Sequence, residues 1–205
     1  MDVEAVTIDA FGTLVSLRDP VPALQRALAA RGVECSAGVV RRAFETEAAY
    51  YVERSHEGRD EATLALLRRD CAGVFLDAAG AGVLDPDEFP YVPSLEFELV
   101  PFGPVACDDL SQAGLKLAVV SNWDIGLRAY LHGLGVDLPV FTSAEAGAPK
   151  PDPAVFELAL SHLGVDDPAR AVHVGDSDAD AEGAAAAGMR FEPAPLVDAA
   201  RRILA

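Results

Sequence analysis

Four short polar segments, far apart in the chain, carry the residue types that could do chemistry. They are residues 9–14 (Asp-Ala-Phe-Gly-Thr-Leu), 121–122 (Ser-Asn), 149–151 (Pro-Lys-Pro) and 175–180 (Gly-Asp-Ser-Asp-Ala-Asp). The first, second and fourth each follow an apolar run, so we expect each to lie at the C-terminal end of a strand. Open parallel α/β sheets bind ligands at that edge. A carboxylate, a hydroxyl, an ammonium and further carboxylates meeting there indicate a metal-assisted hydrolase with a covalent intermediate.

Asp9 is the candidate nucleophile of this set. A carboxylate can act in this way if it stays ionised and is held near its target. Gly12 lets the backbone turn sharply after Asp9, and Thr13 offers a hydroxyl and an amide to the same place. On its own, an aspartate at the end of a strand is more often a helix cap or turn residue. The assignment therefore depends on the whole set.

Ser121 and Lys150 supply groups that could hold an anion. The Ser121 hydroxyl is a donor for a bound oxyanion, although a serine there could simply cap the next helix. We expect Asn122, like Gly12, to border the substrate. Lys150 lies between two prolines in a rigid setting, where it could neutralise a nucleophilic carboxylate and a transferring phosphoryl group. A plain lysine in a proline-rich turn is the alternative.

The acidic turn at 175–180 is the most informative segment. Its carboxylates repel one another unless a cation lies among them, and a few hard oxygen ligands suit Mg²⁺. The alternative is an acidic helix N-terminus stabilised by the helix dipole, above all at Asp178. His173, just before this turn, is predicted to be a buried core residue and not a metal ligand.

Composition limits the possible partners. The 205 residues carry a formal net charge of −17, which disfavours nucleic acids and anionic membranes as partners. A site for an anionic substrate must then supply its own positive charge. No run approaches the ~18 apolar residues of a membrane span, and the first residues lack the basic start of a signal peptide. With 3 cysteines, an odd number that suits reduced thiols, we expect a cytoplasmic protein.

Apolar runs and glycine-terminated helical stretches alternate along much of the chain. We predict strands at 3–8, 116–120 and 171–174, with a weaker one at 140–143, and helices at 104–113, 153–163 and 179–187. This alternation is typical of βαβ units, and it predicts an α/β fold with a Rossmann-like parallel sheet. The short tail after Gly188 leaves a final edge strand as an open question.

Residues 15–95 break that alternation. A helix beginning at Asp19-Pro20 and ending near Gly32, a second beginning at Ser36 and a third over about 60–79 are predicted there. The third carries apolar residues at a 3-4-3-4 spacing, which indicates one buried stripe. We therefore expect a helical cap domain at 15–95, inserted after the first strand of a core formed by 1–14 and 96–205.

The ordered set of four motifs resembles the haloacid dehalogenase (HAD) superfamily over essentially the whole chain. The resemblance implies that Asp9 is the nucleophile and that Thr13 and Ser121 bind the transferred group. It also implies that Lys150 orients the nucleophile. The substrate would then be a small molecule.

The same resemblance implies an Mg²⁺ site made by Asp9, Asp176, Asp180 and the backbone carbonyl of Phe11. Phe11 itself departs from the phosphatase pattern, which has an aspartate two residues after the nucleophile. That aspartate protonates the leaving alkoxide, and losing a general acid typically costs ~10²–10⁴ in rate. Phenylalanine cannot move a proton.

An aromatic residue at the position of Phe11 is similar to 2-haloacid dehalogenases, which use no metal and whose halide leaves unprotonated. Those enzymes also need an arginine from the cap, for which Arg41 or Arg42 are candidates. Three carboxylates offset by Lys150 alone would, however, repel a haloacid by several kcal/mol in a dry site. We therefore expect an Mg²⁺-dependent phosphatase for a small phosphorylated metabolite, weakened by Phe11. A dehalogenase and a catalytically silent binding protein are the alternatives.

Overall fold

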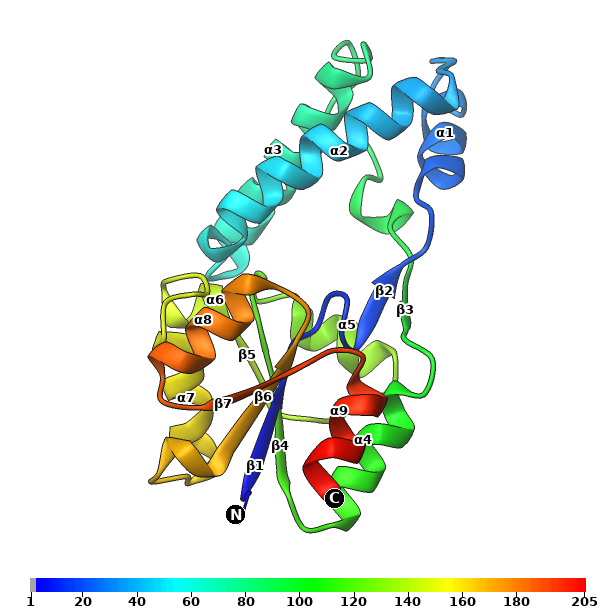
Figure 1. Ribbon diagram of the computed structural model, residues 1–205. Helices are drawn as coiled ribbons and strands as arrows, with labels where there is room; N and C mark the ends of the chain where they lie inside the picture. The colour runs from blue at the N-terminus through cyan, green and yellow to red at the C-terminus, as the bar shows by residue number, and fades with distance from the viewer. Residues whose placement is uncertain (1–2) are drawn as a thin grey trace. The chain divides into compact units, whose positions relative to one another are not determined.

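The computed structural model describes residues 3–205, which form two compact units (Figure 1). One unit comprises the N-terminal part up to Ser16 together with Glu98–Ala205, and the other comprises Leu17–Phe97. Two short strands, β2 (Val15–Leu17) and β3 (Phe97–Leu99), pair with each other where the chain passes from one unit to the other. The sequence-based division into a core at 1–14 and 96–205 and a cap at 15–95 stays a prediction.

The first unit is built on a five-stranded parallel sheet. The strand order is β5 (Val140–Thr142), β4 (Lys116–Ser121), β1 (Ala5–Ile8), β6 (Ala171–Gly175) and β7 (Arg190–Pro193). The central strand β1 is fully buried, as expected for a parallel strand with helices on both faces of its sheet. Its register places Thr7 beside Ala118 of β4 and His173 of β6. The predicted α/β fold is confirmed, and β7 provides the edge strand that follows Gly188.

Helices cover both faces of this sheet (Figure 1). On one face α7 packs against β1, β4 and β5 while α8 packs against β6 and β7, and on the other α4 and α9 pack together. The three helices predicted from the sequence for this unit are present as α4, α7 and α8. The full set of helices in this unit is α4 (Gly103–Gln112), α5 (Leu127–Gly133), α6 (Ser143–Ala146), α7 (Ala154–Leu163), α8 (Asp178–Ala186) and α9 (Leu196–Leu204), with a 3₁₀ turn at Pro168–Arg170.

The second unit consists of helices, as predicted. Its helices are α1 (Val21–Ala29), α2 (Ala37–Arg54) and α3 (Glu61–Ala78), with 3₁₀ turns at Ser55–Glu57 and Val92–Ser94. The side chain of Ser36 accepts a hydrogen bond from the Val39 amide and begins α2, while Asp60 and Thr63 form a capping box that begins α3. The apolar faces of all three helices meet in one core, which includes Leu24, Leu28, Val40, Ala43, Leu67, Cys71, Phe75 and Tyr91.

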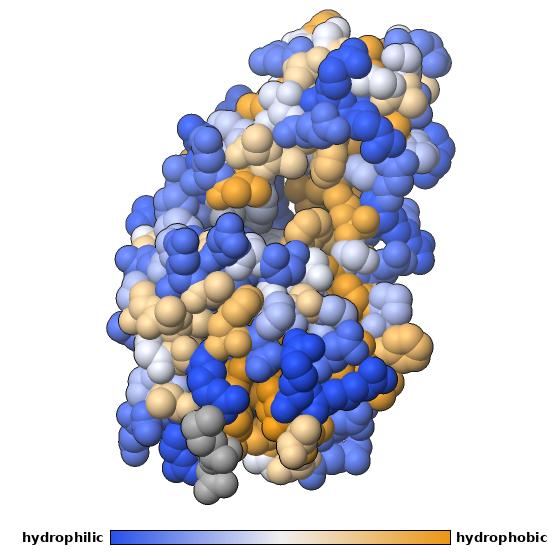
Figure 2. All heavy atoms as spheres, viewed as in Figure 1, coloured by the Kyte–Doolittle hydropathy of each residue, from blue (hydrophilic) through white to orange (hydrophobic). Residues whose placement is uncertain are grey.

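The surface agrees with the acidic composition. Hydrophilic side chains cover much of the visible face of both units (Figure 2), as a net charge of −17 leads one to expect. Within residues 3–205, no helix combines the length and the apolar character needed to cross a membrane.

Candidate active site

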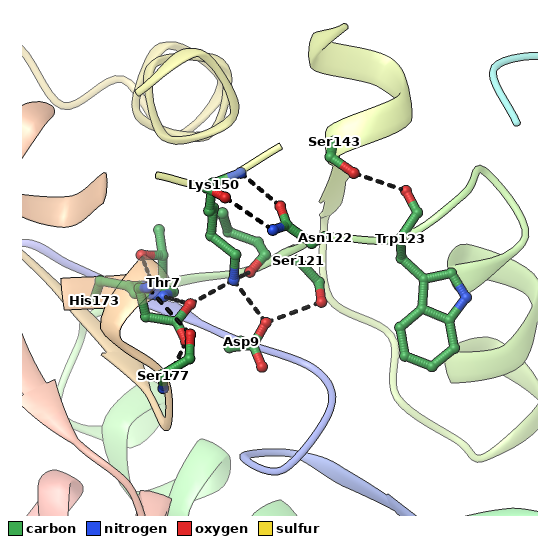
Figure 3. Close-up of polar contacts among 11 residues, drawn as sticks. Thr7, Asp9, Ser121, Asn122, Trp123, Ser143, Lys150, His173 and Ser177 are labelled. Atoms are coloured by element: carbon green, nitrogen blue, oxygen red, sulfur yellow. Dashed lines mark hydrogen bonds and ion pairs between the residues drawn. The ribbon is translucent and has the colours of Figure 1, made fainter. Parts of the chain in front are cut away.

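The polar segments that follow β1, β4 and β6 meet at the C-terminal edge of the parallel sheet (Figure 3). Asp9 directly follows β1, Ser121 is the last residue of β4, and Gly175 ends β6. The Asp9 amide donates to the carbonyl of Val174 at 2.8 Å, which continues the pairing of β1 with β6 up to the site. Strand pairing therefore sets the position of the candidate nucleophile.

The Lys150 ammonium lies at the centre of the site. Its Nζ is 2.7 Å from Asp9 Oδ1 and 2.5 Å from Asp180 Oδ1, and it also donates to the carbonyl of Val120 at 3.1 Å. Burial alone would lower the pKa of this lysine, but the charges of Asp9 and Asp180 outweigh burial and hold the pKa above its usual value. Lys150 is thus a fixed positive charge between two buried carboxylates.

Asn122 holds the backbone of that lysine. The Lys150 amide donates to Asn122 Oδ1 at 2.7 Å, and Asn122 Nδ2 donates to the Lys150 carbonyl at 3.1 Å. The next residue along the chain, Trp123, accepts a hydrogen bond on its carbonyl from Ser143 Oγ at 3.3 Å. These contacts favour a positioning role for Asn122, and its predicted contact with substrate stays a prediction.

Asp180 is held on both carboxylate oxygens. Its Oδ1 faces Lys150 Nζ and His173 Nε2, the latter at 3.0 Å. Its Oδ2 accepts from Ser177 N at 3.1 Å and Ser177 Oγ at 2.5 Å, in the capping box that begins α8. Burial would raise the pKa of Asp180, but the hydrogen bond from His173 and the charge of Lys150 hold it below its usual range. Four donors occupy the acceptor sites of this carboxylate.

Asp9 keeps one oxygen uncommitted. Ser121 Oγ donates to Asp9 Oδ1 at 2.9 Å, on the same oxygen that faces Lys150, whereas no residue among 3–205 donates a hydrogen bond to Asp9 Oδ2. Nearby in the sequence, the hydroxyl of Thr13 is buried and has no hydrogen-bond partner in the described part of the chain. A buried polar group of this kind costs free energy unless something pairs with it. Thr13 Oγ1 and Asp9 Oδ2 are therefore the groups best placed to receive a ligand.

Gly12 allows Asp176 to approach this loop. The glycine has a φ of +85°, and a Cβ placed on it would lie 2.0 Å from Asp176 Oδ2. Asp176 itself is exposed; partial burial, together with the charges of Asp9 and Asp180, raises its pKa. Gly12 therefore makes room for the acidic side chain, while its predicted contact with substrate stays a prediction.

The carboxylates of Asp9, Asp176 and Asp180 suit a divalent cation. One oxygen from each lies within 4.8 Å of the others, and Lys150 is the ammonium that faces two of them. Hard oxygen donors around an excess of negative charge are the ligands that Mg²⁺ prefers. Asp9 Oδ2 and the exposed Asp176 carboxylate are available for coordination. Asp180 accepts four hydrogen bonds, and its predicted coordination of the metal stays a prediction. The predicted contribution of the Phe11 carbonyl stays a prediction.

Phe11 and His173 lie near the site and differ in exposure. Phe11 is 50% exposed, so its ring can face a ligand, yet it offers no proton to a leaving group. His173 is fully buried, as predicted for a core residue, but its contact with Asp180 was missed. The available signal was its place in β6, two residues before Gly175 and therefore on the same face of the sheet.

Solved structures similar to this chain include dehalogenases and phosphatases. The chain is 20% identical to a defluorinating L-2-haloacid dehalogenase, with a TM-score of 0.77 and with 99% of this chain and 96% of that chain covered. It is 22% identical to a HAD phosphatase from Thermococcus onnurineus, with a TM-score of 0.60 and 98% of each chain covered. The L-2-haloacid dehalogenase from Xanthobacter autotrophicus is 27% identical, with a TM-score of 0.60 over 92% of this chain and 76% of that one. These similarities support the fold and do not separate the two chemistries.

Part of the chain is also similar to haloacid dehalogenase-like hydrolase domain-containing protein 3. The match to the Bos taurus protein is 52% identical over 81 residues, which is 37% of this chain and 32% of the relative. The Homo sapiens protein is 47% identical over 83 residues, with the same shares of 37% and 32%. The match thus spans about a third of the length of these relatives.

A family model also matches most of the chain. The model for haloacid dehalogenase-like hydrolases matches residues 3–188, a range that includes all four polar segments. The chain therefore belongs to the haloacid dehalogenase-like hydrolase family.

Proposed function

We propose that the protein is an Mg²⁺-dependent phosphohydrolase that acts on a small phosphorylated metabolite through an aspartyl-phosphate intermediate on Asp9. The observation that carries this proposal is the acidic cluster of Asp9, Asp176 and Asp180 around a single buried ammonium. Two unit charges 4 Å apart interact by about 4 kcal/mol at an effective dielectric constant of 20. An anionic substrate would therefore be repelled by this cluster, unless a cation accompanies it.

Mg²⁺ would be held by Asp9 and Asp176, with the predicted Phe11 carbonyl as a further ligand and Asp180 beside them. When bound, the ion supplies positive charge for the phosphoryl oxygens. Lys150 contributes a second positive charge at Asp9 Oδ1, and the buried hydroxyl of Thr13 offers a donor that has no partner in the described part of the chain. These groups together support a phosphoryl group as the ligand of the site.

Asp9 would take part in both steps of the reaction. A carboxylate oxygen of Asp9 attacks phosphorus while the bond from phosphorus to the leaving oxygen breaks, and the leaving group keeps that electron pair. Water then attacks the phosphorus of the aspartyl phosphate. The bond to Asp9 breaks, its electron pair restores the carboxylate, and of the two protons of the water one leaves on hydrogen phosphate and the other passes to the solvent.

Phe11 sets the class of leaving group. With no carboxylic acid at this position, an alkoxide would have to depart without a proton from the enzyme, and the absence of a general acid costs ~10²–10⁴ in rate. Aryl and acyl phosphates release stable anions that need no proton. We therefore expect the enzyme to prefer these activated phosphates over sugar phosphates.

A 2-haloacid dehalogenase is the second candidate. The half-exposed Phe11 supplies no general acid, and dehalogenation does not need one. Halide leaves as a stable anion, so Asp9 could displace it from carbon without proton transfer. The candidate arginine Arg41 forms an exposed ion pair with Asp19 at 3.4 Å, and Arg42 stays the other candidate for a halide cradle. The acidic cluster disfavours this reading, since a haloacid brings a carboxylate and no cation.

One assay panel tests the two candidates together. Hydrolysis of p-nitrophenyl phosphate, acetyl phosphate and glucose 6-phosphate is measured with Mg²⁺ and with a chelator, beside halide release from 2-chloropropionate. We expect Mg²⁺-dependent hydrolysis of the first two substrates, abolished in Asp9→Asn. Asp178→Asn, which changes an exposed acid in the same turn, should retain the activity. Halide release that persists in the chelator would replace the proposal with the dehalogenase, and inactivity of the folded protein on every substrate would contradict both.

A further inference from the structure

A row of three hydrogen-bonded side chains, Thr7, His173 and Asp180, lies on the face of the sheet covered by α7 and α8. Thr7 on β1 and His173 on β6 are register partners, and Thr7 Oγ1 lies 2.8 Å from His173 Nδ1. The other ring nitrogen, Nε2, is 3.0 Å from Asp180 Oδ1. Figure 3 shows the two side chains beside the Lys150 ammonium. The row therefore connects the interior of the sheet with a carboxylate of the site.

The partners determine which nitrogen of His173 carries the proton. The Asp180 carboxylate can only accept hydrogen bonds, so the nitrogen facing it, Nε2, must be the donor. In the neutral ring Nδ1 is then an acceptor, and Thr7 must donate its hydroxyl proton to it. Full burial lowers the pKa of His173, although its hydrogen bond with Asp180 opposes the shift.

Packing leaves the imidazole little freedom to turn. The ring of Phe156 meets His173 edge-on, with centroids 4.9 Å apart and an interplanar angle of 85°, and Phe191 lies on a further side at 6.4 Å. His173 has no exposed surface. Between them, the aromatic contacts and the Thr7 hydroxyl fix both the position of the ring and its rotation about the Cβ–Cγ bond.

The fixed ring in turn fixes Asp180. Ser177 holds Oδ2 and His173 holds Oδ1, so the carboxylate is anchored at both ends and cannot rotate away from Lys150 Nζ. Lys150 uses the same Oδ1 of Asp180 and reaches Asp9 Oδ1 from there. Losing the His173 donor would leave Oδ1 held only by Lys150, the side chain that Asp180 has to position.

We propose that Thr7 and His173 form a positioning pair, in which the Nε2–H tautomer of His173, set by the Asp180 carboxylate and held in place by the Thr7 hydroxyl on Nδ1, orients Asp180 and through it aligns Lys150 with Asp9. The inference adds a positioning role to the site of the proposed phosphohydrolase. Only the measurement of turnover depends on that proposed function. Outer partners of this kind typically change activity or metal affinity by about 10- to 100-fold when removed. Neither residue touches the substrate.

Two matched pairs of variants test the inference. His173→Leu removes the donor at similar size, whereas the amide of His173→Gln can still donate to Asp180. Thr7→Val removes the hydroxyl at constant shape, whereas Thr7→Ser keeps it. We expect kcat to fall about 10- to 100-fold in His173→Leu, a smaller fall in Thr7→Val, near-normal kcat in the Gln and Ser variants, and an unchanged KM throughout. Equal losses in both members of each pair would indicate a merely structural role and overturn the proposal.

Nitrogen-15 NMR and crystallography test the inference without a measurement of enzyme activity. The spectrum of the wild-type protein should show His173 protonated at Nε2 and unprotonated at Nδ1, with the Nδ1 signal shifted in Thr7→Val, where the hydroxyl donor to that nitrogen is lost. A structure of His173→Gln should retain the Asp180–Lys150 contact, and one of His173→Leu or, if that variant does not fold, of Thr7→Val should show the Asp180 carboxylate rotated. A ring protonated at Nδ1, or an unmoved carboxylate in the variants, would refute the pair. Inactivity of the wild-type protein would instead refute the proposed function.

Discussion

Asp180 in the sheet-bearing unit and Glu47 in the helical unit are both buried carboxylates, but the groups that face them differ in kind. Asp180 faces an ammonium, an imidazole N–H and two donors from Ser177, and its pKa lies below the usual range. Glu47 accepts a short hydrogen bond from the neutral hydroxyl of Tyr91. Burial raises the pKa of Glu47, and its hydrogen bonds with Tyr91 and Cys71 only partly oppose the rise.

The difference shows that burial alone does not decide the charge of a side chain. A cation and several donors hold the pKa of Asp180 below its usual range, whereas the hydroxyl of Tyr91 and the thiol of Cys71 leave the pKa of Glu47 above its ordinary value. The first arrangement maintains charge at the sheet edge, where a reaction can use it. The second joins helix α2 to the segment before the Val92–Ser94 turn through Tyr91, and it stabilises the interior of the helical unit.

Removing the Lys150 ammonium should have the largest effect on the difference between the two buried carboxylates. In Lys150→Met the buried carboxylates of Asp9 and Asp180 lose their shared counter-charge, and breaking a buried pair in this way costs about 3–5 kcal/mol. Lys116→Met, which removes an exposed lysine that donates to the carbonyl of Gly164, should cost about 1 kcal/mol or less. Urea denaturation measures both free energies of unfolding. Equal losses of unfolding free energy in the two variants would mean that Asp9 and Asp180 do not need Lys150 as a counter-charge.

Adding a carboxylic acid at the sheet edge should have the next largest effect, on turnover. Phe11→Asp places an acid where the half-exposed ring now lies, and we expect turnover of alkyl phosphates to rise by about 10²-fold, the lower end of the usual effect of a general acid. Phe11→Asn has nearly the same shape but cannot supply a proton, so it should show no gain. Steady-state kinetics on glucose 6-phosphate and p-nitrophenyl phosphate measures the effect. No rise in a folded Phe11→Asp variant would count against the assigned role of this position.

Crowding the acidic cluster should have a moderate effect. Gly12→Ala forces a residue with a side chain into a backbone conformation with φ +85° and places its Cβ against Asp176. Gly114 has the same φ of +85° with nothing within 4 Å of a built Cβ, so Gly114→Ala measures the backbone strain alone, about 1–2 kcal/mol. We expect Gly12→Ala to lose more stability than this control and to bind Mg²⁺ more weakly. Identical behaviour of the two variants in denaturation and calorimetry would contradict the contact with Asp176.

The smallest expected effect concerns Glu47 and appears as a dependence on pH. Because its pKa is raised above the ordinary 4.5, the folded protein binds this proton more tightly than the unfolded chain does. The resulting stability is fully present below pH 4.5 and is lost as the pH rises through the folded value. Glu47→Gln removes the titration, so the variant should gain stability relative to the wild type as pH rises. Parallel stability curves of the two proteins from pH 4 to pH 8 would show the assignment to be wrong.

The sequence predicted the site better than it predicted the supporting contacts. Asp9 follows β1, Ser121 ends β4 and Asp180 lies in the first turn of α8 after β6, and the strand-end rule was enough to bring them together. Lys150 belongs to no strand, and its place between prolines indicated rigidity but not the carboxylates it would face. Only the structure shows that Asn122 holds its backbone.

The remaining differences have simple physical causes. The helices α5 and α6 are short, so neither presents the long apolar period that sequence patterns detect. Helix α9 was overlooked, although its buried Leu196, Ala199 and Ala200 recur at helical spacing. His173 reads as an ordinary core residue because its partners lie at the distant Thr7 and at Asp180, seven residues later along a turn. Such pairings depend on strand register, which the sequence pattern alone did not specify.

Calorimetric titration of the protein with MgCl₂ tests the central claim most directly, because that claim concerns a cation held by the acidic cluster. The account predicts heat of binding at millimolar Mg²⁺ or below for the wild-type protein and for Asp178→Asn, and its loss in Asp176→Asn. An absence of Mg²⁺ uptake by the wild-type protein, or undiminished uptake by Asp176→Asn, would contradict it.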